Sequence, residues 1–539
     1  MKPRAPTLLL ALALVPGSAS AGGRPMPPPP RVSLSYSVDL NRRADDLFHV
    51  TLRVAGLTDR NAIYQFAATA PGTYQVMNIG RYVKTFEAFD GLGRRVPAAR
   101  IGVNQWRLAR PARVRTIRYA ITETWDSPLD HPIYRMCGTS IENDHVLINP
   151  HAVIGYPEGL QAAPVRLRLA YPSTWQAGTA LERGPDGVYV ADSYDQLVDS
   201  PILLGRLSKA RLVVTGVPID VYAYSETGRI KASQLLGAMS GMLHAAGGFL
   251  GRLPVDRYTF LYHFGDSAAG AWEHSFSSEY VLQEGEFTDS VGQRVTDIAA
   301  HEFFHIVTPL NIHSEIIEHF NFVTPVPSRH LWLYEGTTEW AAHDMQLGAG
   351  LVTPEDYLQT QIRKMQVDRQ AFDTTWSLQK LALTSYSDSG QAQYGNIYMR
   401  GALTAGLLDI RLLELSHGRR GLRDLIVELT HRYGKRRAFP DSTLLDTLVA
   451  MTYPEIREFF DRYVVSAQHL PIEAYYAKLG ITLVADPQGQ PLRFEIDSNP
   501  TTEQLALRQA WLGRPVRSSS ASGTRRRRRG RGTAGARPR

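Results

Sequence analysis

Two histidines four residues apart, with a glutamate directly after the first, are the residues of this 539-residue chain best suited to metal chemistry. His301 and His305 lie in a segment whose spacing predicts a helix, and residues four apart share one face of a helix. Two imidazoles on one face can bind one metal ion, and Glu302 can take a proton from a metal-bound water molecule. The pattern H-E-x-x-H therefore predicts a zinc site that catalyses hydrolysis.

A catalytic zinc site needs a third protein ligand, and candidates lie in the next predicted helix, residues 329–347. Glu335 and Glu339 are four residues apart there and share a face. We expect Glu335 to bind zinc and Glu339 to accept a hydrogen bond from a ligating imidazole, which fixes the orientation of the ring. An acidic pair on a helix often faces solvent, but the leucines and tryptophans around this pair favour burial.

Four sequence blocks, in a characteristic order, carry a resemblance to a known family. They are Gly270-Ala271-Trp272-Glu273-His274, His301-Glu302-Phe303-Phe304-His305, the segment L-W-L-Y-E-G-T-T-E-W at 331–340, and Tyr398-Met399-Arg400-Gly401. Together they resemble the glycyl aminopeptidase family of zinc metallopeptidases, which belongs to the gluzincin clan and is related to the aminopeptidase N superfamily. Upstream, the segments A-P-G-T-Y at 70–74 and R-Y-V at 81–83 are similar to elements of that family's N-terminal domain.

The resemblance, which spans roughly residues 32–485, implies a zinc-dependent aminopeptidase with one Zn²⁺ per chain. Many members of the family also carry a PDZ domain after the catalytic domain, and we expect no complete one after Leu479 in this sequence. The resemblance also implies that the Tyr398 phenol stabilises the oxyanion of the reaction. A carboxylate at Glu273 would bind the free amine of a peptide, and Gly270 and Ala271 would let the peptide approach as an added strand. The structural alternatives are a core tyrosine and a glutamate exposed at a strand end.

Two other functions use the same residues. If Glu273 does not face the cleft, the enzyme would be a zinc endopeptidase of the same clan. The other alternative is a non-catalytic peptide-binding relative, although the presence of Glu302 argues against it, because a binding site needs no general base.

The order of the predicted elements is typical of a multidomain α+β protein. Residues 32–215 alternate short β-rich runs with turns, which predicts a β-sandwich-like N-terminal domain. Residues 216–485 are expected to form a thermolysin-like, mostly helical catalytic domain, with a short β section at 259–280 before the metal helix. Helices are predicted over residues 233–250, 291–307, 329–347, 354–366, 401–415, 422–433 and 441–451. Residues 486–539 are expected to be a C-terminal extension.

The N-terminus predicts export. Residues 1–21 combine a short basic start, an apolar run and an A-S-A cleavage site, as in a signal peptide, and residues 22–31 form a Pro-rich leader. No apolar run is long enough for a transmembrane helix. The expected location is the bacterial periplasm or the medium, and the expected partners are peptides with a free N-terminus. The single cysteine, Cys137, excludes an internal disulfide.

The net charge of +7 comes from the C-terminus. Nine arginines and no acidic residue lie between residues 516 and 539, so this tail accounts for the whole excess of positive charge. Such a sequence is expected to be disordered and to contact polyanions without specificity. A specific nucleic-acid partner is not predicted for an exported protein.

Overall fold

Alternating apolar residues build the N-terminal strands in the computed structural model, which describes residues 32–435 and 437–513. In β1 (Leu34–Asp39) every second side chain is buried, and β12 (Val165–Ala170) repeats this pattern beside it in parallel register. A sheet with one face on a core and one face in solvent requires such alternation. The predicted signal peptide (1–21), the Pro-rich leader (22–31) and the Arg-rich tail lie outside the described residues.

The strands of the N-terminal region form three sheets within the described residues. The other strands are β2 (Leu47–Arg53), β3 (Ile63–Gln65), β4 (Val83–Asp90), β5 (Arg95–Val96), β6 (Ala98–Arg100), β7 (Gln105–Leu108), β8 (Val114–Thr122), β9 (Ser140–Ile141), β10 (His145–Ile148), β11 (Tyr156–Pro157), β13 (Gln176–Thr179), β14 (Glu182–Arg183), β15 (Tyr189–Ala191) and β16 (Ile202–Gly205). Short helices are α1 (Pro150–Val153), α2 (Tyr194–Val198) and the 3₁₀ turns η1 (Asp59–Asn61), η2 (Ile79–Tyr82), η3 (Pro111–Arg113) and η4 (Arg135–Cys137).

The largest sheet packs against a smaller one through aromatic side chains. Its strand order is β14-β15-β12-β1-β2-β8-β4-β5, and the two smaller sheets have the orders β11-β3-β7-β6 and β13-β16-β10-β9. Tyr119 of the largest sheet lies edge-on to Phe66, which directly follows β3, at 5.1 Å between ring centroids. Tyr64 of β3 is fully buried beside them. The predicted β-sandwich-like arrangement is confirmed.

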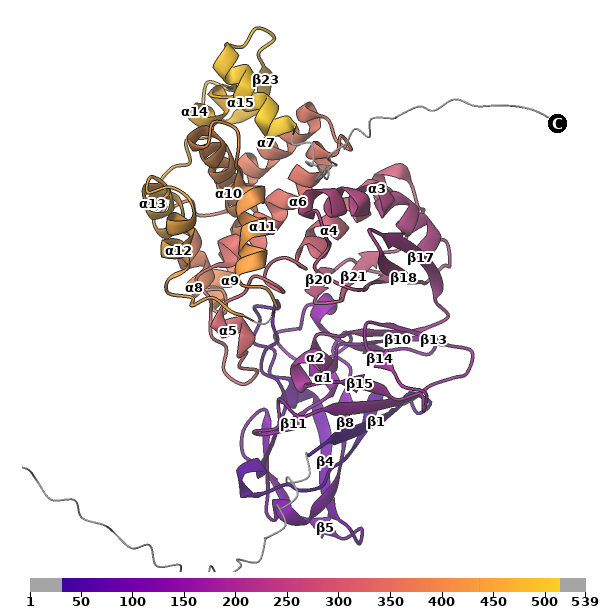
Figure 1. Ribbon diagram of the computed structural model, residues 1–539. Coiled ribbons are helices and arrows are strands. Elements are labelled where there is room, and N and C mark those ends of the chain that lie inside the picture. Colours follow the sequence, from indigo (N-terminus) through magenta and orange to yellow (C-terminus); the bar gives the residue numbers. More distant parts are fainter. Residues whose placement is uncertain (1–31, 436, 514–539) are drawn as a thin grey trace, which may run out of the picture. The chain divides into compact units, whose positions relative to one another are not determined.

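A fourth sheet, which has both parallel and antiparallel strands, begins the second half of the fold. It comprises β17 (Ser208–Val214), β18 (Val217–Ser225), β19 (Tyr258–Gly265), β21 (Ser277–Gln283) and β20 (Gly270–His274), in that spatial order. All of β19 is buried, because both faces of the sheet are covered. Helices α3 (Ala232–Leu250) and α4 (Asp289–Phe304) pack on one face (Figure 1), and strands β13 and β16 pack on the other. Strand β20 is left at the edge, antiparallel to β21.

Helices form most of the remaining chain, drawn from salmon to yellow in Figure 1. They are α5 (Glu315–Glu318), the π-helical turn η5 (Trp332–Gly336), α6 (Thr337–Gly348), α7 (Pro354–Ala371), α8 (Leu378–Leu383), α9 (Asp388–Gln393), α10 (Asn396–Leu415), α11 (Leu422–Arg432), α12 (Leu444–Met451), α13 (Ile456–Phe460), the π-helical turn η6 (Asp461–Val465), α14 (Ile472–Ala477) and α15 (Thr502–Leu512). The hairpin β22 (Ile481–Ala485) and β23 (Pro491–Ile496) precedes α15.

The multidomain α+β class predicted from the sequence is confirmed. Within the C-terminal extension, β23 packs against α7 and α15 packs against α10. The main local difference from prediction is in residues 329–347, where the π-helical turn η5 interrupts the expected helix directly before α6. Among the described helices, each is too short or too polar to cross a lipid bilayer.

Candidate metal centre and substrate cleft

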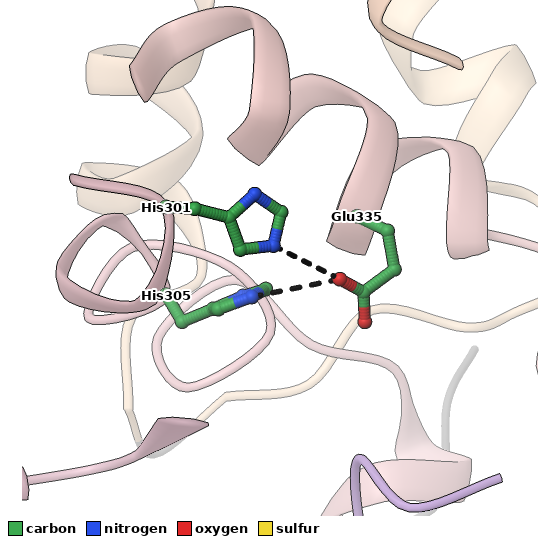
Figure 2. Close-up of side chains that lie close together, drawn as sticks. All are labelled: His301, His305 and Glu335. Carbon is green, nitrogen blue, oxygen red and sulfur yellow. Dashed lines mark ion pairs between the residues drawn. The ribbon is translucent and has the colours of Figure 1, made fainter. Parts of the chain in front are cut away.

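The end of helix α4 carries both histidines of the H-E-x-x-H pattern, His301 in its last turn and His305 as the residue that directly follows it. Thr288 caps its N-terminus by accepting a hydrogen bond from the Val291 backbone at 3.3 Å, and the helix ends at Phe304, before Pro309. The rings of His301 and His305 are buried, and their centroids are 4.8 Å apart. Figure 2 shows that both rings point a nitrogen at one oxygen of Glu335. The Nε2 atoms lie 3.4 Å and 3.5 Å from Oε2.

These three side chains fit a zinc ion by geometry as well as by type. Zinc binds nitrogen and oxygen at about 2.0–2.2 Å, so neighbouring ligand atoms around a tetrahedral ion lie about 3.3–3.6 Å apart. The distances of 3.4 Å and 3.5 Å from Nε2 to Oε2 match this separation. Both Nδ1 atoms have acceptors, Glu339 Oε2 for His301 and the Thr308 carbonyl for His305, each at 2.8 Å. The Nε2 lone pairs are therefore free for a metal.

Two glycines explain how Glu335 reaches the histidines. A Cβ atom on Gly336 would lie 2.6 Å from the Gly401 Cα atom, and one on Gly401 would lie 2.8 Å from the Gly336 Cα atom. Turn η5 and helix α10 therefore touch backbone to backbone, which any side chain would prevent. This contact brings Glu335 and Tyr398 to one place. The sequence contains both glycines within the recognised blocks, but their pairing is visible only in the structure.

The Glu339 carboxylate has three charged or polar partners. Besides His301, its carboxylate contacts the ammonium group of Lys364 on α7 and the His343 ring, the latter at 3.2 Å. Burial alone would raise the pKa of Glu339, but Lys364 and the bonds from His301 and His343 outweigh it and hold the pKa well below its usual value. The predicted hydrogen bond to His301 is present. Lys364 was not predicted; its only signal in the sequence is a lysine between the apolar residues Ile362 and Met365.

We expect Glu339→Gln to weaken zinc binding without abolishing it. The amide removes the charge that Lys364 balances and weakens the bond that orients His301, and loss of such an outer partner costs about 10–100-fold in metal affinity. Zinc titration against a competing chelator measures this change. The control is Glu355→Gln at an exposed position of α7. Equal affinity in both variants would contradict the orienting role.

Glu302 and Tyr398 line the same cleft as the three candidate ligands. Burial raises the pKa of the Glu302 carboxyl to about 7, against the opposing charge of His301, and a bound divalent cation would oppose the shift further. The Tyr398 ring lies 5.5 Å from that of His301, centroid to centroid. Burial, reinforced by the charge of Glu335, raises the pKa of Tyr398 well above its usual value. The Tyr398 hydroxyl therefore stays protonated and can donate a hydrogen bond.

A cleft of about 300 Å³ opens beside these residues. Glu273 and Ala271 of β20 line it, whereas Gly270 does not, and instead lies against Met136 at the start of the strand. One oxygen of Glu273 lies within 4.8 Å of ligand-capable atoms of both Glu302 and His305. The structure thus gathers all the predicted catalytic, metal-binding and amine-binding side chains around one cleft.

Other lining residues were not singled out from the sequence. They come from two loops of the N-terminal region and from the segment before α10, and include Gly72, Thr73, Tyr134, Met136, Gln391 and Tyr394. Only Gly72 and Thr73 lie in a recognised block, and nothing in their local sequence relates them to a cleft more than two hundred residues away along the chain.

The fold and this site define the class of the zinc metallopeptidases. The sequence profile described as the peptidase M61 N-terminal domain matches residues 35–206, and that of the M61 glycyl aminopeptidase matches residues 294–404. Together they cover more than half of the chain. The chain belongs to the M61 family of glycyl aminopeptidases, as its sequence blocks indicated, and it is a hydrolase that acts as a zinc peptidase.

Solved structures agree with this fold. An aminopeptidase N family protein from Idiomarina loihiensis is 20% identical, with 85% of this chain and 81% of that chain covered and a TM-score of 0.74. An M1 zinc metallopeptidase from Deinococcus radiodurans is 14% identical, with 82% and 94% covered and a TM-score of 0.50. A variant of a two-domain M1 zinc metallopeptidase bound to L-arginine is 13% identical, with 82% and 94% covered and a TM-score of 0.50. No curated protein matches the sequence.

Proposed function

We propose that this protein is an exported aminopeptidase that releases the N-terminal residue of peptides, with one zinc ion per chain held by His301, His305 and Glu335. The observation that carries the proposal is the place of Glu273, whose carboxylate lies within 4.8 Å of atoms of Glu302 and His305. A carboxylate there pairs with a protonated amine only when that amine is close to the scissile bond. Substrates with a free N-terminus are therefore favoured over internal peptide segments.

The chemistry divides among four side chains of this protein. Zinc, when bound, polarises the scissile carbonyl and lowers the pKa of a water molecule. Glu302 takes the proton of the attacking water and passes it to the departing amine. Tyr398 donates a hydrogen bond to the carbonyl oxygen as negative charge develops on it. Glu273 holds the substrate amine, and Ala271 leaves the β20 edge open to the peptide backbone.

Tyr398→Phe is expected to lower kcat by about 10²–10³-fold, the usual effect of removing one oxyanion donor. Bound zinc, measured by elemental analysis, should not change, because the phenol is not needed as a ligand. Tyr433→Phe, directly after α11, is the control, since Tyr433 is not among the residues that line the cleft. An unaltered kcat would mean that Tyr398 is only a packing residue of α10.

A panel of aminoacyl amides, with and without chelator and with free or acetylated amines, tests the proposed function. We expect chelator-sensitive hydrolysis of the free-amine substrates alone. Glu273→Gln should reduce their kcat/KM by about 10–100-fold, the value of a charge-assisted hydrogen bond. It should change the acetylated substrates much less, because they carry no charge for Glu273 to bind. No release from any free N-terminus would refute the aminopeptidase, and equal hydrolysis of both forms would indicate an endopeptidase.

Two parts of the proposal depend on residues outside the described ranges. Export to the periplasm or the medium is a prediction from residues 1–21, and contact with polyanions is a prediction from the Arg-rich tail. Neither is needed for the chemistry of the cleft.

A further inference from the structure

The N-terminal region forms the end of the cleft next to Glu273. A Cβ atom on Gly72, whose φ is +77°, would lie 2.5 Å from the Glu273 Oε1 atom and 2.6 Å from the Trp272 Nε1 atom. Trp272 Nε1 donates a hydrogen bond of 3.1 Å to the Pro71 carbonyl. The backbone of residues 71–72 therefore lies directly against the carboxylate, with no space for a further group between them.

This loop is anchored in the catalytic half of the protein by Tyr74. The ring of Tyr74 is 6% exposed and belongs to the hydrophobic core of the catalytic half. It packs at 5.2 Å from the ring of Tyr394 and 6.1 Å from that of Tyr386, centroid to centroid. The Tyr394 hydroxyl in turn lies 3.4 Å from that of Tyr398. The loop thus reaches the site through a chain of tyrosine contacts that ends at Tyr398.

Gln391 on α9 joins two loops of the N-terminal region to the helices. Its amide donates hydrogen bonds to the Tyr74 carbonyl at 2.6 Å and to the Ser385 carbonyl at 2.5 Å, and its oxygen accepts one from the Tyr134 hydroxyl at 3.2 Å. Gln75 connects the same two loops by bonds to Pro132 and Tyr134. Both Gln391 and Tyr134 line the cleft.

We propose that Gln391 is a specificity-determining residue. Its hydrogen bonds hold residues 70–75, called the wall below, in a position that closes one end of the cleft. The closed end leaves room for one substrate residue on the N-terminal side of the scissile bond. This inference rests on the proposed aminopeptidase function and deepens it. Glu273 selects an amine by charge, whereas the wall excludes any group bonded to that amine by steric contact. The cleft volume of about 300 Å³ lies at the small end of ligand pockets, which agrees with a closed end.

The test compares Gln391→Met with Gln393→Met in the full, zinc-loaded enzyme. Methionine keeps the length of the side chain but removes all three hydrogen bonds of Gln391. Gln393 lies on the same helix and only accepts a bond from the Asp373 backbone, so its variant is a matched control outside the cleft. The probes are the best aminoacyl anilide of the panel and its N-acetyl counterpart.

Gln391→Met should raise kcat/KM on the acetylated anilide relative to the free one by about tenfold or more, since neutral hydrogen bonds that hold the wall are lost. Amide hydrogen exchange of residues 70–76 and 131–138 should quicken in the same variant, and Gln393→Met should change neither quantity. Tyr134→Phe removes a single hydroxyl from a half-exposed side chain. It should change the ratio of kcat/KM values and the amide exchange rates in the same direction as Gln391→Met, but by smaller amounts. It gives the same comparison should Gln391→Met fold poorly.

Two results would overturn the inference. If the wild type is selective and Gln391→Met and Tyr134→Phe keep that selectivity within twofold, roughly the error of such ratios, Gln391 does not determine it. Faster amide exchange of residues 70–76 without a change in the ratio of kcat/KM values would also show that Gln391 does not determine selectivity, because the wall would then move without affecting the substrate. A wild type that cleaves both anilides equally would instead refute the aminopeptidase function itself, and the wall with it.

Discussion

Glu302→Gln should lower kcat by about 10²–10⁴-fold, the usual contribution of a positioned general base and acid. Gln has nearly the same shape but cannot accept the proton of the attacking water or return it to the leaving amine. Because Glu302 is buried beside the zinc ligands without being one of them in the proposed site, the variant should still bind zinc. Steady-state kinetics on the best aminoacyl amide, together with zinc content, measures both effects.

A control variant distinguishes loss of catalysis from loss of structure in Glu302→Gln. Glu286→Gln, at an exposed residue that pairs with Arg229, repeats the chemical change outside the cleft and should keep full activity. Single-turnover experiments should show the same deficit as kcat, because the proton transfers belong to the chemical step. If Glu302→Gln retains zinc and cleaves at the wild-type rate in a chelator-sensitive way, the proposed mechanism is wrong.

Glu335→Gln should remove zinc from the protein. Loss of an outer hydrogen-bond partner already costs about 10–100-fold in affinity, so loss of a charged ligand should cost more than about 100-fold. The consequence for stability can be measured, since zinc at about 100 times its Kd stabilises the folded state by about 2.7 kcal/mol and at its Kd by only about 0.4 kcal/mol. Chelator should therefore lower the Tm of the wild type and leave that of Glu335→Gln almost unchanged.

Glu318→Gln is the matched control for this experiment, because Glu318 is exposed and is not part of the ligand cluster. It should bind zinc normally and show the wild-type response to chelator. A Glu335→Gln enzyme with stoichiometric zinc and a wild-type chelator response would require a different third ligand. Glu273 would then be the next carboxylate to consider, since it also lies within 4.8 Å of a ligand atom of His305.

Local sequence patterns predicted the helices that carry the site. Residues four apart on a helix share a face, so His301 and His305 could be placed together without a structure. The predicted helix at 233–250 matches α3 to within one residue, because its apolar spacing and the following Gly251, at φ +73°, are local signals. The turn η5 was not foreseen, since a π-helical turn depends on the approach of α10 rather than on the residues of the turn itself.

The closed end of the cleft could not be predicted in this way. Tyr74 and Gln391 are joined by a hydrogen bond although they are 317 residues apart. Tyr74 lies in the segment A-P-G-T-Y that the resemblance includes, but nothing in the local sequence of either residue relates it to the other, because a hydrogen bond between distant segments leaves no periodicity in either. The same holds for Lys364, whose importance depends on Glu339 being buried beside it.

By itself, the sequence determined the candidates for the chemistry, namely two histidines and a glutamate as proposed zinc ligands and Glu302 as the proposed base, and it contained the blocks that relate the chain to glycyl aminopeptidases. These features depend on residue type and on spacing within single elements. Only the tertiary structure decided how η5 meets α10, which charge balances Glu339 and which loops close the cleft around Glu273. Those features depend on side chains and backbones from distant segments packing at close range, and no single segment contains that information.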